Sequence, residues 1–492
     1  MNSGLIAATI LETIRQFQPH IAGALTLAIT VAASVHVLVN KRDSRAATGW
    51  IGLIWLAPVI GAGVYMLLGI NRIRRKAVRL RKGASKLRFA RRREAAGTEA
   101  LRAVLGPDRR HLLPLARVMD NVTRRPLLAG NRILPLQDGS QAYPAMLRAV
   151  DEAERSVSLA SYIFSNDAVG ATFREALGRA VRRGVQVRVL IDDVGARYSV
   201  PPITSSLRRA GVRVAHFMPT MIPWGMPYVN LRSHRKILVA DGRTGFTGGL
   251  NIGQSYQGRD AEPPRIRDLH FRVEGPVVAD LQEVFAEDWF FCTGERLSEE
   301  AWFPPLAEAG GVLARGIADG PDEDFDKLRW TLLGAIECAG RSVIVVTPYF
   351  LPDEALVTAL CVAAMAGVRV DILLPERSNL RLVQWASYPL LPELLARGCR
   401  IWLSPPPFDH SKLMLVDSSW ALLGSGNWDP RSLALNFEFN LECYSPGLAA
   451  ALERIAARKR RSARELKLAD LMLRNRAARL RDAAVRLLSP YL

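Results

Sequence analysis

The sequence predicts an α/β protein made of two duplicated α/β sandwich halves that form one active site, preceded by an N-terminal transmembrane hairpin. Three observations support this fold class. Two long apolar segments occur before residue 70, strand-like runs alternate with helical patterns further along, and one polar motif occurs twice. Of the 492 residues, 49% are hydrophobic, which is enough for a folded core and excludes a disordered or collagen-like chain.

The hairpin is predicted from residues 21–39 and 46–70, neither of which carries a formal charge. A bilayer core of about 30 Å requires roughly 20 apolar residues per spanning helix, so both segments are long enough. Pro58, Gly61 and Gly63 are expected to kink the second segment or to make it re-entrant. Buried core helices are the alternative interpretation of both segments.

The positive charge is confined to two flanking segments. The net charge is +19, from 66 Lys+Arg and 47 Asp+Glu. Residues 71–93 contain 12 basic and no acidic residues, and residues 453–486 contain 12 basic and 4 acidic ones, so the remaining body is nearly neutral. Next to a membrane segment, such a run favours a contact with anionic lipid over a solvated linker, since each Lys or Arg there adds about 1 kcal/mol. The positive-inside rule then predicts a multi-pass inner-membrane protein whose catalytic halves face the cytoplasm.

An internal duplication organises the rest of the chain. Three pairs of similar runs follow in the same order, separated by 186, 183 and 187 residues. Helical patterns over residues 169–183 and 354–366 lie between the runs. We expect a mostly parallel sheet flanked by helices in each half. The paired runs are residues 155–164 and 341–350, 184–191 and 367–374, and 211–214 and 398–401.

Each half also contains the pattern His-x-Lys-x4-Asp-x6-Gly-[Gly/Ser]-x-Asn with identical spacing. On a strand, positions i and i+2 share a face, so the His and Lys of each copy are expected to point into one cleft. A single His-x-Lys is usually surface noise, but two matched copies make coincidence very improbable. The positions are His234, Lys236, Asp241, Gly249 and Asn251 in the first copy and His410, Lys412, Asp417, Ser425 and Asn427 in the second.

These residue types suit the cleavage of a phosphodiester through a covalent intermediate. One imidazole can attack phosphorus while the other, protonated, supplies a proton to the leaving alkoxide. Two Lys and two Asn side chains can surround the phosphoryl oxygens. No carboxylate or His cluster has the spacing of a metal site, so we expect neither a metal nor a cofactor.

The duplicated motif resembles the paired HKD motifs of the phospholipase D superfamily, and the whole chain looks like a bacterial cardiolipin synthase. The resemblance implies phosphatidyl transfer between two phosphatidylglycerol molecules, giving cardiolipin and glycerol through a phosphohistidine. Another phosphatidyltransferase or a phospholipase D hydrolase of the same superfamily is the main alternative, and a nuclease or a non-enzymatic scaffold is less favoured. Further matching stretches are residues 55–61, 65–69, 347–353, 429–432, 436–438 and 488–492.

The resemblance also implies roles for single residues. His234 would be the nucleophile and His410 the acid and base, and an acidic residue downstream of each motif would orient the motif His. The matching acids are Asp268 and Glu438. Asp241 and Asp417 belong to the catalytic motif but are interpreted as structural, and Gly249 replaces a Ser often found there. The expected phosphate-binding residues are Lys236, Lys412, Asn251, Asn427 and Ser425.

The expected partners are phospholipid substrates and an anionic membrane surface. Nucleic acid is not expected, because the basic residues flank the membrane segments instead of covering the nearly neutral body. The sequence leaves the oligomeric state open. The predicted segments are a hairpin (1–70), a basic juxtamembrane linker (71–125), two phospholipase D-like domains (126–310 and 311–447) and a basic helical C-terminal segment (448–492).

Overall fold

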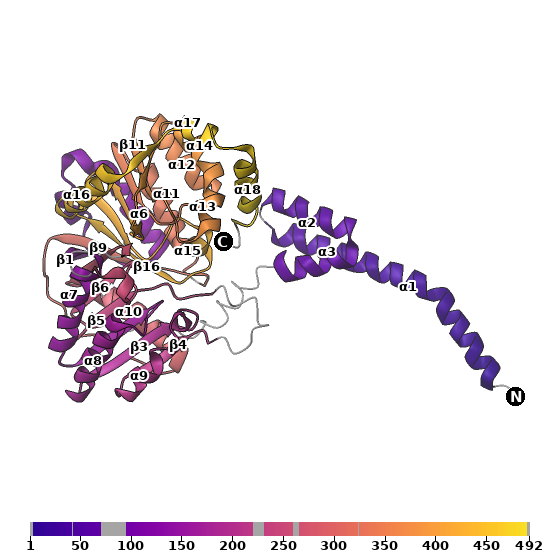
Figure 1. Ribbon diagram of the computed structural model, residues 1–492, viewed down its shortest axis with the longest axis horizontal. Helices are drawn as coiled ribbons and strands as arrows, with labels where there is room; N and C mark the ends of the chain where they lie inside the picture. Colours follow the sequence, from indigo (N-terminus) through magenta and orange to yellow (C-terminus); the bar gives the residue numbers. More distant parts are fainter. Residues whose placement is uncertain are drawn as a thin grey trace. The chain divides into compact units, whose positions relative to one another are not determined.

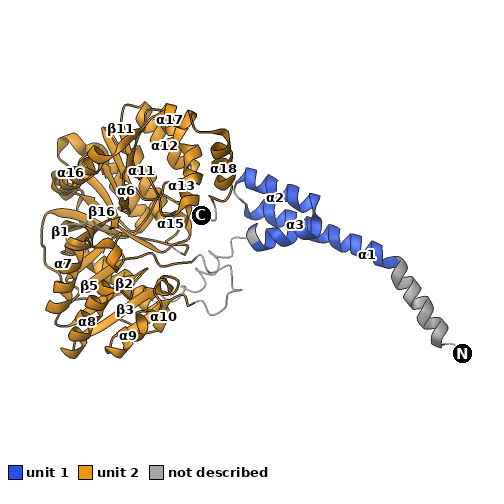
Figure 2. Cartoon of the chain, viewed as in Figure 1, with its two compact units in different colours: residues 1–76 blue, residues 77–492 orange. Residues whose placement is uncertain are grey.

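The computed structural model describes residues 3–41, 43–69, 95–219, 231–258, 265–322 and 324–489. The chain divides into two compact units, residues 1–76 (unit 1) and residues 77–492 (unit 2), and each is described by itself (Figure 2). The predicted basic run at residues 71–93 lies outside the described residues.

Unit 1 contains one helix of membrane-spanning length. Within α1 (Ser3–Asn40), residues Phe17–Asn40 form a stretch of 24 residues with a mean hydropathy of 2.0. The second apolar segment is broken into α2 (Ser44–Leu56), α3 (Pro58–Val64) and the π-helical turn η1 (Tyr65–Gly69). Among the described residues α1 is the one candidate span, so the predicted pair of spans is not supported.

Pro58 explains the break in the second segment. Proline has no backbone N–H and disfavours a helical residue before it, and Ala57 accordingly leaves the helix with φ −139° and ψ 75°. Helix α2 has 13 residues and is therefore about 20 Å long, which is short of a bilayer core of about 30 Å. The π-turn begins at Tyr65, whose hydroxyl lies 2.8 Å from Nδ1 of His36 on α1.

Unit 1 exposes a large apolar surface. The side chains of Leu25 and Leu38 on α1 are 59% and 65% exposed, and Leu56 at the end of α2 is 88% exposed. Exposed Leu surface of this extent is typical of a membrane contact. The short helices pack closely on one another, since a Cβ at Gly61 would lie 2.4 Å from the carbonyl oxygen of Leu53.

Unit 2 is built on one mixed sheet, in which the described residues contribute 15 strands (Figure 1). The order is β17-β12-β11-β10-β14-β15-β16-β9 in one half and β1-β8-β6-β5-β2-β3-β4 in the other. In each half three strands are parallel, β2-β3-β4 and β10-β11-β12, and the duplicated runs form equivalent strands. The halves join through antiparallel β1 and β9, where Asn131 pairs with Val312.

The duplicated α/β fold is therefore as predicted, with helices between the parallel strands of each half. The expectation of a mostly parallel sheet is wrong, because the motif strands β5 and β14 and the strands beyond them pair antiparallel. Three further elements precede it, α5 (Thr98–Leu105), η2 (Pro107–Leu112) and α6 (Leu113–Thr123). The first half contains β1 (Leu128–Gln137), α7 (Asp138–Glu152), β2 (Ser156–Ser161), α8 (Ala168–Arg182), β3 (Gln186–Asp192), η3 (Gly195–Tyr198), α9 (Thr204–Arg209), β4 (Arg213–Phe217), β5 (Ile237–Ala240), β6 (Thr244–Gly248), η5 (Gln254–Tyr256), β7 (Ile266–Arg267), β8 (Leu269–Glu274) and α10 (Val278–Thr293).

The second half has a similar order, except that its short strand β13 precedes the motif strands, whereas β7 follows them in the first half. It contains β9 (Val312–Asp319), α11 (Lys327–Glu337), β10 (Ser342–Val346), α12 (Glu354–Met365), β11 (Arg369–Pro375), α13 (Arg381–Ser387), η6 (Tyr388–Leu390), α14 (Leu391–Ala396), β12 (Arg400–Ser404), β13 (Phe408–Asp409), β14 (Leu413–Val416), β15 (Trp420–Gly424), α15 (Pro430–Ala434) and β16 (Glu438–Tyr444). Each half has its own buried apolar cluster, one centred on β2 and β3 and the other on β10 and β11.

The C-terminal basic segment is less uniformly helical than expected. It forms α16 (Pro446–Ser462), the strand β17 (Arg464–Leu466), α17 (Leu468–Met472) and α18 (Arg476–Arg486). Strand β17 adds to the edge of the sheet because Leu466 is buried opposite Ile401 of β12. The segment is therefore part of unit 2 and not a separate helical tail.

Candidate active site

The two motif segments lie at the interface between the two halves of unit 2. Each His-x-Lys segment leads into a strand, β5 in the first half and β14 in the second. The backbone N–H of His234 donates to the carbonyl of Phe437 at 2.9 Å, and that of His410 donates to the carbonyl of Arg267 at 2.7 Å. Each motif segment therefore lies beside the acid-bearing segment of the other half.

The imidazoles and the carboxylates pair in the same crossed way. Nδ1 of His234 lies 3.1 Å from Oε2 of Glu438, and Nδ1 of His410 lies 2.7 Å from Oδ2 of Asp268. Each acid thus reaches the motif His of the opposite half, whereas the sequence resemblance relates each acid to the motif that precedes it. Because Nδ1 is occupied in both rings, Nε2 is the nitrogen available to a substrate.

The Glu438 side chain is longer than that of Asp268, and the residue packed against each acid differs in size accordingly. Glu438 is fully buried and accepts hydrogen bonds from the hydroxyls of Ser425 and Ser432 and from the side-chain amide of Asn436. At the equivalent of Ser425 the first half has Gly249, where a Cβ would lie 2.1 Å from Oδ1 of Asp268. The shorter Asp268 thus occupies the space that a serine side chain would need.

The motif lysines are buried beside the histidines. Nζ of Lys236 donates to the carbonyl oxygen of His234 at 2.6 Å, and Nζ of Lys412 lies 2.8 Å from Nδ1 of His410. Burial lowers the pKa of Lys236 to about 7 and that of Lys412 to about 8, because a charged ammonium is poorly solvated there. The intervening Arg235 is directed instead to Asp288 on α10, to which it donates at 2.7 Å.

Burial also shifts the pKa values of the two histidines and of Asp268. It lowers the pKa of His234, and it lowers that of His410 well below the usual range, with Lys412, Lys236 and His234 adding repulsion. Burial raises the pKa of Asp268 to about 6. The two ammonium groups thus disfavour protonation of the imidazoles, and a bound phosphodiester anion would oppose this effect.

The two motif asparagines differ in their surroundings. Asn251 accepts a hydrogen bond from the N–H of Ile163 at 3.1 Å and donates to the hydroxyl of Tyr256 at 3.0 Å. Oδ1 of Asn427 is buried and has no hydrogen-bond partner among the described residues. The Asn427 amide therefore has unused hydrogen-bonding capacity beside the site, whereas both ends of the Asn251 amide are engaged.

The motif aspartates lie away from the imidazoles. Asp241 accepts hydrogen bonds from the N–H groups of Glu154, Arg155 and Ser156 at 2.7–2.9 Å. Asp417 accepts the equivalent bonds from residues 340–342 and also contacts Nε2 of His111 at 2.6 Å. Both carboxylates thus tie the end of a motif strand to the start of the neighbouring strand.

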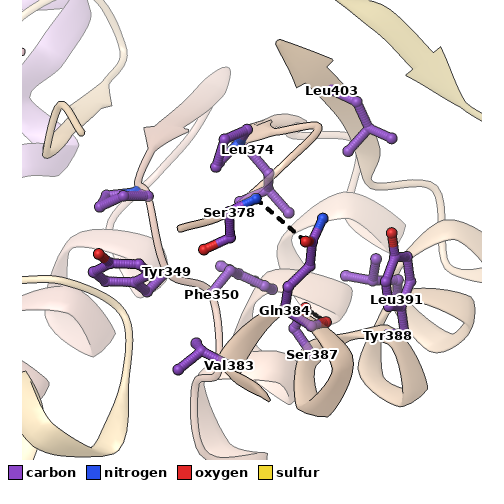
Figure 3. A pocket seen from close by; sticks show the side chains of 12 residues that line it. Tyr349, Phe350, Leu374, Ser378, Val383, Gln384, Ser387, Tyr388, Leu391 and Leu403 are labelled. Carbon is purple, nitrogen blue, oxygen red and sulfur yellow. Dashed lines mark hydrogen bonds between the residues drawn. The ribbon is translucent and has the colours of Figure 1, made fainter. Parts of the chain in front are cut away.

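Aromatic side chains, to which the sequence analysis assigned no role, also line the site. The ring of Tyr162 lies edge-on to His234 with centroids 5.2 Å apart, and that of Tyr349 lies edge-on to His410 at 6.0 Å. The Tyr256 ring is 6.5 Å from His410. Tyr349 also forms one end of a narrow, mostly apolar pocket that reaches Tyr388 (Figure 3). A single tyrosine after a strand has no spacing pattern, which is why sequence reasoning missed these residues.

The fold and the site define a class of protein. A duplicated α/β unit, with two His-Lys motifs that meet across the halves and pair with carboxylates, has the architecture of the phospholipase D superfamily. Among the described residues, no group of three or more His, Cys, Asp or Glu side chains is placed to hold a metal ion.

Comparisons with known proteins identify the family. The sequence profile of the family described as "Cardiolipin synthase, PLD-like domain" matches residues 146–289 and 332–460, and a "Phospholipase_D-nuclease N-terminal" profile matches residues 28–69. The chain belongs to this cardiolipin synthase family.

Individual relatives match over nearly the whole chain. A cardiolipin synthase of Geobacillus kaustophilus is 32% identical, covering 95% of this chain and 93% of that protein. Cardiolipin synthase A of Pseudomonas putida is 33% identical, covering 94% and 96%. Among solved structures, a phosphatidylserine synthase of Haemophilus influenzae has the same fold, with a TM-score of 0.59 at 16% identity over 77% of this chain and 100% of that one.

Proposed function

We propose that this chain is a phosphatidyltransferase that makes cardiolipin from two molecules of phosphatidylglycerol and releases glycerol. The crossed pairs His234–Glu438 and His410–Asp268 carry the proposal, because they supply two oriented imidazoles to one buried, cationic site. The relatives named cardiolipin synthase support the choice of substrates and products.

In the first step, Nε2 of His234 attacks phosphorus of one phosphatidylglycerol. A P–N bond forms, the bond from phosphorus to the headgroup glycerol oxygen breaks, and His410 gives that oxygen a proton. In the second step, a terminal glycerol hydroxyl of another phosphatidylglycerol gives its proton back to His410 and attacks phosphorus. The P–N bond then breaks, which restores His234.

The contacts of the two histidines support this order. His234 has its Nδ1 on Glu438, whose pKa is lowered chiefly by His234 and Lys236 against the opposing effect of burial, so this carboxylate stays charged beside the nucleophile. Burial, and then the charge of Lys412 at its Nδ1, lower the pKa of His410 well below the usual range, and a bound phosphodiester anion opposes the effect of Lys412. An imidazole whose pKa depends on the bound substrate suits a group that first gives and then takes a proton.

The remaining motif residues would stabilise the phosphoryl oxygens. Lys236 and Lys412 bring positive charge, and the side-chain NH2 group of Asn427 is a hydrogen-bond donor. The unpartnered atom of Asn427, its oxygen Oδ1, is an acceptor and does not bind a phosphoryl oxygen. Asn251 and Ser425 would take part only by exchanging their present partners, so we assign Asn251 mainly to the shape of the site and Ser425 mainly to holding Glu438.

Purified full-length protein incubated with phosphatidylglycerol labelled in the headgroup glycerol tests the activity. Equal amounts of cardiolipin and free glycerol are expected. Phosphatidic acid without cardiolipin would show a hydrolase instead. In His410→Ala a label on the phosphatidyl group should remain attached to His234, and a stable adduct on His410 in His234→Ala would reverse the assignment of the two histidines.

For the membrane, we propose that unit 2 lies on the cytoplasmic side. With α1 as a single span, the basic residues at positions 41, 42 and 45 directly follow it in the sequence. They would lie on the same side of the membrane as the run at 71–93, which the positive-inside rule places in the cytoplasm. A reporter fused after residue 93 should be active in the cytoplasm, and activity only in the periplasm would refute this topology.

A further inference from the structure

One face of helix α18 packs against the rest of unit 2. It packs on α13, and Asp482 on that face is 1% exposed (Figure 1). The guanidinium of Arg481 lies over the ring of Trp385 at 4.0 Å and donates to Asp482 at 2.7 Å. Val485 packs on a small apolar cluster that includes Ala386 and Leu390. The orientation of the helix is therefore fixed.

The opposite, outer face of α18 carries solvent-exposed leucines and arginines. Leu480 and Leu487 are 73% and 80% exposed and lie on one stripe, since they are seven residues apart. Arg476, Arg479 and Arg486 are exposed on the same side, and within the described residues no ion pair joins them to a carboxylate.

A groove runs between α18 and η6 beneath this face. Its walls include Leu471, Leu480 and Pro389, and the guanidinium of Arg474 lies 3.6 Å above the ring of Tyr388. The one acid in the lining, Asp482, is engaged by Arg474 at 2.8 Å and by Arg481 at 2.7 Å. The groove therefore has apolar walls and an excess of positive charge from Arg476 and Arg479.

We propose that the outer face of α18, with this groove, docks on the surface of an anionic phospholipid bilayer. Lipid phosphates would bind the arginines while the leucines enter the region of the first acyl carbons, and long Arg side chains can reach the headgroups from that depth. A nucleic acid would satisfy the arginines but leave the leucines in water. An apolar protein partner would leave the arginines unpaired.

The position of α18 connects this contact to the active site. Tyr388 lines both the groove and the pocket that reaches Tyr349 (Figure 3). The hydroxyl of Tyr349 donates to Asn379, just before α13, and its ring lies against His410. Docking through α18 would therefore place the bilayer next to the elements that border the proposed proton donor.

Full-length protein in vesicles tests the contact without relying on the transfer reaction. A polarity-sensitive fluorophore is attached to Leu480→Cys in a chain whose two half-buried cysteines, Cys292 and Cys338, are replaced by Ser. Leu134→Cys, an exposed apolar position on β1, is the matched control. The vesicles are of phosphatidylcholine alone or of phosphatidylcholine with phosphatidylserine, which is anionic but is not the proposed substrate, and the readout is quenching by brominated lipid.

We expect strong quenching at position 480 only in the phosphatidylserine vesicles and none at position 134. Arg476→Glu with Arg479→Glu should reduce this quenching at least about fivefold, because each basic residue strengthens an anionic contact by roughly that factor. The same reversal at Arg208 and Arg209 on α9 should leave it unchanged.

Equal quenching in both vesicle types, or none in either, would overturn the proposal. So would a fluorophore that is already shielded in detergent. Shielding that depends on protein concentration would indicate a second copy on this face, and shielding that does not would indicate another segment of the chain. Transfer activity on phosphatidylglycerol in micelles, measured on each variant, shows separately whether the proposed reaction holds.

Discussion

The crossed pairing predicts that Glu438 and Asp268 act on different steps of the reaction. Glu438→Gln keeps the size of the side chain and an oxygen that can accept the Nδ1 proton of His234, but it removes the charge. Asp268→Asn does the same beside His410. Because Glu438 contacts the proposed nucleophile, its variant should be slow in forming the phosphohistidine. Asp268→Asn should be slow in both proton transfers, so that an adduct which has formed persists.

The size of the Glu438 effect follows from the geometry. The imidazole of His234 becomes positively charged as the P–N bond forms, and its Nδ1 lies 3.1 Å from the carboxylate. At an effective dielectric constant of about 20, this attraction is about 5 kcal/mol, which corresponds to at most roughly four powers of ten in rate. Part of the attraction already exists before the reaction, so we expect the rate of adduct formation to fall about 10²–10³-fold.

Rapid-quench experiments with phosphatidylglycerol labelled in the phosphate measure both steps in one assay. The label bound to protein is followed over time, and the melting temperature of each variant shows that it is folded. Glu438→Gln should show little bound label at any time, whereas Asp268→Asn should accumulate it. If the phenotypes were exchanged while the adduct still formed on His234, each acid would act on the histidine of its own half, and the crossed arrangement would be wrong as an account of catalysis. An exchange with the adduct on His410 would instead reverse the roles of the two histidines.

Three further predictions concern pH and stability. Burial lowers the pKa of Lys236 to about 7 and that of Lys412 to about 8. In a pH–rate profile, kcat/KM should therefore fall as the pH rises through this range and the ammonium groups lose their protons. Lys236→Arg should move this fall to higher pH. Arg235→Ala leaves Asp288 buried without its bidentate partner, so denaturant unfolding should show a loss of about 3–5 kcal/mol, partly recovered when Asp288 is also replaced by Leu. Asp241→Ala removes an acceptor of three backbone N–H groups and should lower the unfolding free energy by about 1–3 kcal/mol, while a labelled adduct still forms, in contrast to His234→Ala.

The sequence was sufficient for the duplicated fold because the repeat provides an internal comparison. Two copies of each run, at nearly constant separation, predict equivalent strands, and β2-β3-β4 and β10-β11-β12 are those strands. The membrane prediction was less successful because a count of apolar residues ignores local backbone chemistry. Residues 46–70 are long enough to span a bilayer, but Pro58 ends the helix after Leu56.

The crossed arrangement of the site could not be predicted in the same way. A repeat shows which residues are equivalent, but it does not show whether Asp268 contacts His234 or His410. That choice depends on the pairing of Ser233 with Phe437 and of β7 with β13, which are long-range contacts between the halves. The hydrogen bonds from Ser432 and Asn436 to Glu438 could not be predicted either, because neither residue is part of the repeated motif.

The crossing also makes the site depend on the packing between the halves. Arg235, which lies between His234 and Lys236 in the first motif, donates to the backbone carbonyl of Glu438 at 3.1 Å and pairs with Asp288 on α10. The same side chain thus holds the acid of the second half and a helix of the first half in register. Because neither half contains both members of a His–carboxylate pair, both pairs form only when the two halves pack together. This dependence allows the surroundings of the two histidines to diverge, with Lys412 at the ring of His410 and no equivalent contact at His234, so that a symmetric repeat can serve two different steps.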